Sequence, residues 1–65
     1  MSPDLLIIAV AAGEPLEGLD LAKGGYARLA LAGATFSRIR FAETDFRGSD
    51  LRETVFDQCD LRGAL

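Results

Sequence analysis

The sequence of 65 residues contains no histidine, no tryptophan and a single cysteine. Without histidine, neither a histidine-based catalytic triad nor the usual zinc sites of histidine and cysteine can be assembled. A single cysteine also excludes an internal disulfide, which is typical of a protein in a reducing compartment. Cys59 stands where small or apolar residues recur, so we expect a buried packing residue rather than a reactive thiol. We therefore predict no metal site and no cofactor.

Long apolar runs and a strong charge of one sign are also missing. The one continuous apolar run, Leu5 to Ala12, has eight residues, whereas a helix needs about twenty to cross a bilayer. Asp4 precedes this run, where a secretory signal would carry basic residues. The formal net charge is −3, from 7 basic and 10 acidic residues, so nucleic acid would find no basic surface. We expect a soluble, cytoplasmic protein that contacts neither membrane nor nucleic acid directly.

What the sequence does have is a period of five from residue 16 onward. Every fifth residue is large and apolar or aromatic, and we call these residues the centres: Leu16, Leu21, Tyr26, Leu31, Phe36, Phe41, Phe46, Leu51, Phe56 and Leu61. From Leu19 onward, the residue two before each centre is small or apolar, and every charged residue after Leu16 occupies one of the other three positions. A period of five fits neither a helix nor a strand. The chain must therefore turn a corner in every repeat.

Three of these repeats, Thr44 to Gly48, Ser49 to Glu53 and Cys59 to Gly63, read small residue, aspartate, then Phe or Leu. This pattern resembles the pentapeptide-repeat family, and the period covers about fifty residues. The resemblance implies an all-β solenoid, a right-handed quadrilateral β-helix with about twenty residues per coil and about two and a half coils. The repeats at Gly24 to Tyr26 and Leu29 to Leu31 depart from the family pattern, because they lack the acid before the centre.

The N-terminal segment has the features of a capping helix. Ser2-Pro3-Asp4 supplies a hydroxyl N-cap, a proline in the first turn and an acid near the positive end of the helix dipole. Gly13 is expected to end this helix, because glycine is common just after the last helical residue. Such a helix would cover the first unpaired edge of the solenoid. A short strand over Leu5 to Val10 is the alternative, because that run is rich in β-branched residues. The predicted organisation is a capping helix in residues 1–13 and a repeat β-helix in residues 14–65.

Three aspartates, Asp45, Asp50 and Asp60, share the position before the centre. Paired carboxylates can act as general acid and base, but the repeat accounts for these three, and exposed acids between arginines usually form a solvated face. The phenylalanines belong to the centres, so core packing is favoured over a stacking platform for bases. The Gly24-Gly25 pair lacks the following Lys-Ser or Lys-Thr of a phosphate loop. We predict no catalytic residues and no enzymatic activity.

A twenty-residue coil also predicts which side chains stack. Asp20, Arg40 and Asp60 would form a column of alternating charge, and Lys23 would lie beside Glu43. Adjacent coils are about 4.8 Å apart, so these opposite charges would be in contact range. Such exposed pairs contribute little free energy, but they fix the register of one coil on the next.

Glycine recurs two positions after a centre, where the backbone must bend, at Gly18, Gly33, Gly48 and Gly63.

The expected core comprises Leu21, Tyr26, Leu31, Phe36 and Phe41. The sequence stops within a repeat, so the last centres have no layer above them, and an unpaired strand edge is a template for further pairing. The outer side of the N-terminal helix should also lie against something else. The predicted interface therefore comprises Phe46, Leu51, Phe56, Leu61, Leu65, Leu5, Leu6 and Ile8.

These surfaces predict a structural or protein-interaction module. Either two chains form a homodimer through their last coils, or the 65 residues are part of a longer solenoid that continues over this edge. The family resemblance implies an alternative, a binding module for a larger bacterial partner. That partner would be DNA gyrase, a type II topoisomerase that some family members inhibit or protect as mimics of duplex DNA, or a component of protein secretion. The eight acids and seven bases after residue 15 argue against DNA mimicry, because a mimic needs a strongly negative surface.

Overall fold

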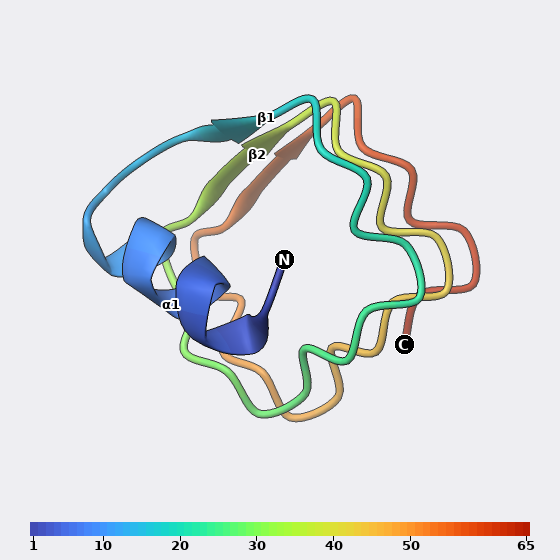
Figure 1. Ribbon diagram of the computed structural model, residues 1–65, viewed down its shortest axis with the longest axis horizontal. Coiled ribbons are helices and arrows are strands. Elements are labelled where there is room, and N and C mark those ends of the chain that lie inside the picture. The colour runs from blue at the N-terminus through green and yellow to red at the C-terminus, as the bar shows by residue number, and fades with distance from the viewer.

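The computed structural model describes all residues from Met1 to Leu65. One helix, α1 (Pro3–Ala11), is followed by three short parallel strands, β1 (Leu16–Glu17), β2 (Thr35–Ser37) and β3 (Val55–Asp57). The strands lie side by side in the order β1-β2-β3. Between them the chain winds round a common axis, and successive windings lie one behind another along that axis (Figure 1). The protein therefore has the β-helix-like architecture that the family resemblance implies.

Each winding takes twenty residues. Leu16 in β1 pairs with Phe36 in β2, and Phe36 pairs in turn with Phe56 in β3. The same offset continues outside the strands as isolated parallel bridges. We use this register to divide the repeat segment into a first layer (residues 16–35), a second layer (residues 36–55) and a last layer (residues 56–65).

Backbone hydrogen bonds join each layer to the next around the whole winding. The Leu31 N–H donates to the Asp50 carbonyl oxygen at 3.0 Å, and the Asp50 N–H donates back to the Leu29 carbonyl oxygen at 2.9 Å. This alternation has the pattern of a parallel ladder, although only three short segments are regular strands. The ladder satisfies backbone groups that a winding without long strands would otherwise leave unpaired.

The N-terminal segment is a helix and not the alternative strand. The Ser2 hydroxyl caps it by accepting a hydrogen bond from the Leu5 N–H at 3.2 Å, and proline occupies its first turn. Leu6 projects into the core and is fully buried. The Tyr26 hydroxyl donates to the Met1 carbonyl oxygen at 2.8 Å. These two contacts fix α1 against the first layer, and Figure 1 shows it in front of the winding.

The core fills the axis of the first two layers. All five predicted core residues are buried, with exposed fractions between 0% and 5%. Their aromatic rings interlock, since the Phe36 and Phe41 centroids lie 5.1 Å apart and the Phe41 and Phe46 centroids 5.2 Å apart, both in edge-to-face contact. Edge-to-face pairs add attraction beyond the burial of apolar area. The complete core cluster is Leu6, Leu21, Tyr26, Leu31, Ala34, Phe36, Ile39, Phe41 and Phe46.

Hydroxyl side chains two residues before a centre form hydrogen bonds to the preceding layer. Thr44 is fully buried, and its hydroxyl donates to the Leu21 carbonyl oxygen of the preceding layer at 3.0 Å. Thr54 repeats this contact with the Leu31 carbonyl oxygen, also at 3.0 Å. Cys59 occupies the equivalent place and is only partly buried, with its sulfur 3.5 Å from the Phe36 carbonyl oxygen. Small polar side chains therefore tie adjacent layers together without leaving a buried polar atom unpaired.

The backbone bends two residues after every centre. The four glycines at this position have positive φ, from 70° at Gly63 to 78° at Gly33. Six other residues adopt the same left-handed conformation, in which a side chain costs about 1–2 kcal/mol. They are Lys23, Arg28, Arg38, Glu43, Glu53 and Gln58. The pairing between layers holds these corners in place against the local preference of their residues.

Gly24 has a packing role that the sequence does not reveal. It occupies an inward position, and the Tyr26 ring folds over it. A Cβ atom at Gly24 would overlap Tyr26 Cε2 and lie 2.8 Å from Cζ, whereas a Cβ atom at Gly25 would meet nothing within 4 Å. The missing side chain at Gly24 therefore leaves the space that lets Tyr26 reach the carbonyl oxygen of Met1.

We expect Gly24→Ala to lower the free energy of unfolding by about 1–3 kcal/mol, the usual cost of overpacking. Gly25→Ala is the matched control, because both glycines have φ outside the left-handed region and only one is crowded. Urea unfolding followed by circular dichroism measures both. Equal midpoints for the two variants would contradict this explanation of Gly24.

Candidate functional site

The outer surface of the solenoid is built from repeated aspartate–arginine pairs. The Asp45 carboxylate accepts hydrogen bonds from the backbone N–H of Arg47 at 2.9 Å and from its Nε and Nη2 at 3.0 Å. The same fork recurs at Asp50 with Arg52, and at Asp60 with Arg62. Both members of each pair face outward, one before and one after a centre, so a single corner positions them. Bidentate pairing of this kind is the strongest form of the arginine–carboxylate contact.

These contacts hold the three aspartates ionised. Hydrogen bonds from the arginine side chain, and then from its backbone N–H, lower the pKa of each carboxyl from 3.8 to about 2 at Asp45, Asp50 and Asp60. General acid and base catalysis needs a pKa near the working pH. Carboxylates that are ionised at neutral pH and occupied by arginine therefore act as structural groups.

The lowered pKa values predict a sensitivity to acid. A carboxyl whose pKa is lower in the folded chain than in the unfolded one, about 3.9, stabilises the fold above that unfolded value. The contribution falls away as pH decreases through the folded pKa of about 2. We expect Tm to drop between pH 4 and pH 2, and the drop to be smaller when Asp45, Asp50 and Asp60 are all replaced by asparagine. Thermal melts across this range measure it.

Asp57→Asn is a suitable control for charge alone, because Asp57 forms no ion pair. It should leave the acid sensitivity of Tm unchanged. An equally steep fall of Tm in the triple variant would contradict a role for these three pairs.

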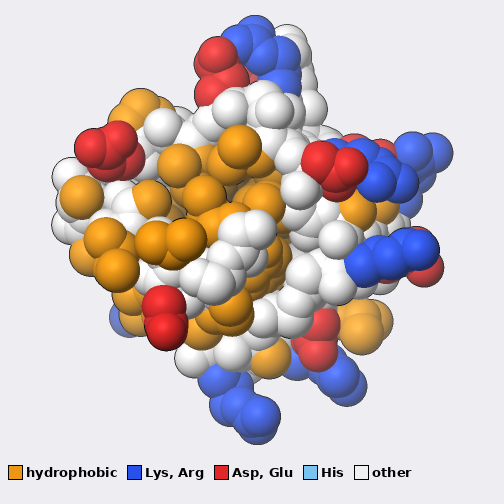
Figure 2. All heavy atoms as spheres, in the orientation of Figure 1, with side chains coloured by type: hydrophobic (Ala, Val, Ile, Leu, Met, Phe, Trp, Pro, Cys, Tyr) orange, Lys and Arg blue, Asp and Glu red, His pale blue; other side chains and the backbone are white.

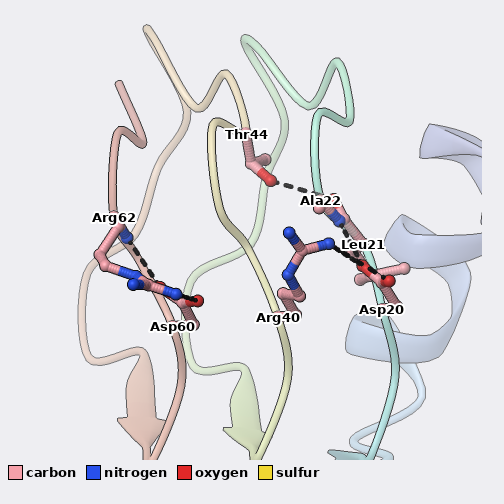
Figure 3. A network of polar contacts seen from close by, with 7 residues as sticks. All are labelled: Asp20, Leu21, Ala22, Arg40, Thr44, Asp60 and Arg62. Carbon is pink, nitrogen blue, oxygen red and sulfur yellow. Dashed lines mark hydrogen bonds and ion pairs between the residues drawn. The ribbon is translucent and has the colours of Figure 1, made fainter.

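The predicted column of alternating charge is only partly formed. The backbones of Asp20, Arg40 and Asp60 stack in register, and Arg40 Nη1 lies 3.4 Å from Asp20 Oδ2. The Asp60 carboxylate instead binds Arg62 at 2.8 Å, and Figure 3 shows Arg40 turned toward Asp20. An arginine two residues along the same corner reaches the carboxylate without crossing between layers, so this local contact prevails.

The expectation that Lys23 would pair with Glu43 is wrong, because these side chains form no ion pair. A different contact joins the first and second layers, between Arg38 Nη2 and Glu17 Oε2 at 2.7 Å. Residues at different positions of the repeat can therefore meet across layers when their side chains are long.

The open end of the solenoid is one candidate interaction surface. We call it the face of the last layer, and it also includes residues 51–55 of the second layer, whose N–H groups meet no following layer. Leu61 and Leu65 are exposed there, by 40% and 66%, while Leu51 and Phe56 are partly buried. Phe46 was predicted to belong to this surface, but it is buried with an exposed fraction of 6%. Its ring packs against the rings of Phe41 and Phe56, with centroids 5.2 and 6.3 Å away, and its N–H donates to the Leu65 carbonyl oxygen at 2.9 Å.

Backbone donors on this face also lack partners. The N–H groups of Leu51, Glu53, Leu61 and Gly63 make no hydrogen bond within the chain. Their equivalents twenty residues earlier donate to the following layer at 2.7 to 3.0 Å, and these are Leu31, Gly33, Phe41 and Glu43. The last layer therefore presents an unpaired ladder edge beside exposed apolar side chains.

The outer side of α1 is a second candidate surface. Leu5 and Ile8, which belong to the predicted interface, are exposed by 58% and 62%. Leu6 was predicted to join them, but it is fully buried in the core. The helix is apolar all round, so the sequence alone could not tell which side faces the first layer. In Figure 2 apolar side chains gather over α1, while lysine and arginine project mainly from the rim of the solenoid.

The structure contains no pocket and no cluster of side chains arranged to hold a metal ion. The nine-residue helix α1 is too short to cross a membrane. The candidate surfaces are the two apolar end faces, and between them lies the charged rim.

Parallel pairing at a fixed offset, inward centres and bends at a constant position define a repeat protein of the β-helix-like class. Within that class, the family model for pentapeptide repeats matches residues 30–65 with 8 copies. The chain belongs to the pentapeptide-repeat family, which confirms the resemblance seen in the sequence. Pentapeptide repeats are structural modules that are generally non-catalytic and often take part in protein interactions. No curated protein and no solved structure matches the chain.

Proposed function

We propose that the chain is a non-enzymatic protein-interaction module that associates with a second copy through the face of its last layer. We infer a right-handed quadrilateral β-helix of about two and a half coils, with a capping segment in residues 1–13 and a repeat segment in residues 14–65. The main observation behind this proposal is that several backbone N–H groups on that face have no hydrogen-bond acceptor within the chain. An exposed ladder edge of this kind favours pairing with another edge.

The position of α1 supports a second copy related by a twofold axis. Because α1 lies in front of part of the first layer (Figure 1), it would obstruct the last layer of one copy from stacking on the first layer of another. That obstruction disfavours an open head-to-tail fibre. A twofold contact instead brings the same edge from both chains together. It would bury Leu61 and Leu65, which are exposed in the single chain.

The alternatives have less support. A further coil of a longer solenoid would also accept hydrogen bonds from the unpaired N–H groups on the face of the last layer. In that case the face would be covered permanently, whereas a dimer can dissociate. Mimicry of duplex DNA toward gyrase is disfavoured, because five aspartate or glutamate carboxylates on the rim pair with arginines. Their negative charge is therefore compensated locally. No feature of the surface favours a secretion component over other proteins.

Sedimentation equilibrium of the wild type and of Leu61→Asp tests the proposal. We expect a concentration-dependent dimer in the wild type at micromolar concentration, and dimerisation at least tenfold weaker in the variant, or about 1.4 kcal/mol or more, because two carboxylates would meet at the twofold axis. Ile8→Asp introduces the same charge on the opposite end face and is the control. A folded wild-type monomer at high concentration would contradict self-association and favour the longer solenoid.

A further inference from the structure

Each repeat presents its backbone donors and acceptors to the following layer in a fixed order. The N–H groups of a centre and of the residue two after it donate to that layer, as Leu31 and Gly33 do at 3.0 and 2.9 Å. The carbonyl oxygen two residues before a centre accepts from that layer, as Leu29 does at 2.9 Å. The centre carbonyl also faces it, because Leu21 accepts the Thr44 hydroxyl. Each centre therefore lies midway between an acceptor and a donor.

This order is complementary to itself when the chain direction is reversed about a centre. Turning a second copy by 180° about an axis through Phe56 places each residue opposite the one equally far on the other side of Phe56. The two edges then run antiparallel, and Phe56 faces its own copy. Three unpaired N–H groups meet three carbonyl oxygens that accept no backbone hydrogen bond in the single chain: Glu53 faces Cys59, Gln58 faces Thr54, and Gly63 faces Ser49. One rotation therefore brings donors opposite acceptors on both sides of the axis.

The charges on the rim favour the same axis independently. Asp60 and Arg52 stand equally far from Phe56 on its two sides, and so do Arg62 and Asp50. The rotation places Asp60 opposite Arg52 of the second copy, and Arg62 opposite Asp50. Each carboxylate already binds an arginine of its own corner at 2.8 Å and would gain a second arginine across the contact. Side chains directly opposite on antiparallel strands have Cβ atoms about 4.5–5.5 Å apart, which is within reach of an ion pair.

Other positions of the axis are less favourable. An axis half a repeat earlier would place Asp57 opposite Asp50, and one half a repeat later would place it opposite Asp60. Like charges directly opposite one another destabilise a strand pair. An axis one full repeat away in either direction would leave part of the donors without acceptors, such as the Glu53 N–H for an axis at Leu61. Backbone pairing and charge therefore select one register.

The apolar side chains of the open end agree with this register. Because the centres are evenly spaced, rotation about Phe56 places Leu61 opposite Leu51. Leu51 and Phe56 are partly buried in the single chain, and Leu61 is 40% exposed, so the contact would remove apolar surface from water. The two carboxylates of Leu61→Asp would lie on either side of the axis, each in place of an apolar contact.

We propose that two copies associate about a twofold axis through Phe56, with the Asp50–Arg52 pair of each copy contacting the Asp60–Arg62 pair of the other. This register rests on the self-association proposed above and adds which residues meet. It identifies a second copy of the same chain as the partner, because the order of backbone donors and the pattern of charges are each complementary to themselves.

Two charge-exchanged variants test the register. One combines Asp50→Arg with Arg52→Asp, and the other combines Asp60→Arg with Arg62→Asp. In either variant alone, like charges would face each other across the axis. We therefore expect self-association in sedimentation equilibrium to be at least about tenfold weaker than in the wild type. In an equimolar mixture every facing pair would again have opposite charges, so heterodimers should form with an affinity near that of the wild type. Misfolding of either variant would not be reversed by mixing.

Glu17→Arg combined with Arg38→Glu is the matched control, because this pair joins the first and second layers at 2.7 Å and lies away from the open end. It should leave self-association unchanged. If the wild type dimerises and both exchanged variants dimerise equally well, or if their mixture shows no recovery, the register is wrong while self-association stands. A wild-type monomer would overturn both proposals.

A measurement on the wild type tests the register without any substitution. In a mixture of isotope-labelled and unlabelled chains, NMR detects nuclear Overhauser effects between copies. We expect such contacts between the methyl groups of Leu61 in one copy and Leu51 in the other. Contacts joining Leu61 to Leu61 instead would place the axis at a different centre and would overturn the proposal.

Discussion

Replacing Phe41 with alanine should unfold the protein or come close to it. Phe41 is fully buried, and its ring contacts Phe36, Phe46 and Phe56, with centroids 5.1 to 5.8 Å from its own for all three. Removing a phenylalanine from such a position costs about 3–5 kcal/mol. A domain this short has a small free energy of unfolding, because it buries a smaller fraction of its surface than a larger domain does.

Thermal and urea unfolding of Phe41→Ala measure this effect. A loss of about 3 kcal/mol in a domain of this size lowers Tm by roughly 12–24 °C. Val55→Ala is the matched control, because Val55 is 51% exposed on the outer side of β3. Surface substitutions of this kind usually change stability by about 0.5 kcal/mol or less. If Phe41→Ala melted within a few degrees of Val55→Ala, the axis of the solenoid would not be the core.

Inserting one alanine between Gly33 and Ala34 should be at least as damaging. Every later centre would move by one position, so the phenylalanines of the second layer would turn outward and charged residues would turn inward. The hydroxyl contact from Thr44 to the Leu21 carbonyl oxygen would also be lost. We expect loss of the cooperative unfolding transition and of dispersed amide signals in an NMR spectrum.

The same insertion between Gly13 and Glu14 provides the control. This site lies between α1 and β1, outside the paired windings, and short insertions in a connecting loop are tolerated. That variant should keep most of its stability. A folded Gly33 insertion with unchanged stability would mean that the repeat absorbs the extra residue as a local bulge, and that register is not what organises the chain.

The inward register was predictable because it depends on a single repeated property. Residues such as Leu31 and Phe41 recur at every fifth position and are apolar, and the structure buries them. The corners were predictable at glycines such as Gly33 for the same reason. Glutamate and arginine do not themselves favour positive φ, so this conformation could not be predicted from the residue types of Glu43 and Arg38. It is imposed by pairing between layers.

The side-chain contacts were harder to predict. The Asp-x-Arg pattern at Asp45 and Arg47 was visible as a repeat, and its recurrence was the signal for a pair within one corner. Backbone register alone predicted that Asp60 would contact Arg40. It did not take into account that Arg62, two residues along the same corner, reaches Asp60 first. The role of Gly24 depends on the direction of the Tyr26 ring, which no sequence period specifies.

The interface prediction failed at two residues for different reasons. Leu6 belongs to a helix that is apolar on all sides, so only docking on the first layer decides that it faces the core. Phe46 belongs to the second layer, and its ring packs against Tyr26 of the first layer and Phe56 of the last layer. In both cases the contacts that bury the side chain come from residues distant in the sequence. A repeat pattern describes the residues within each corner but not the residues that pack against it.

The most direct test is an NMR measurement of scalar couplings across hydrogen bonds, which identify each donor nitrogen with its acceptor carbonyl. We predict couplings from Leu31 to Asp50, from Asp50 to Leu29 and from Phe41 to Asp60, at separations of 19 or 21 residues. Couplings between residues four apart throughout residues 16–65 would identify helices, and they would contradict a chain whose windings pair every twenty residues.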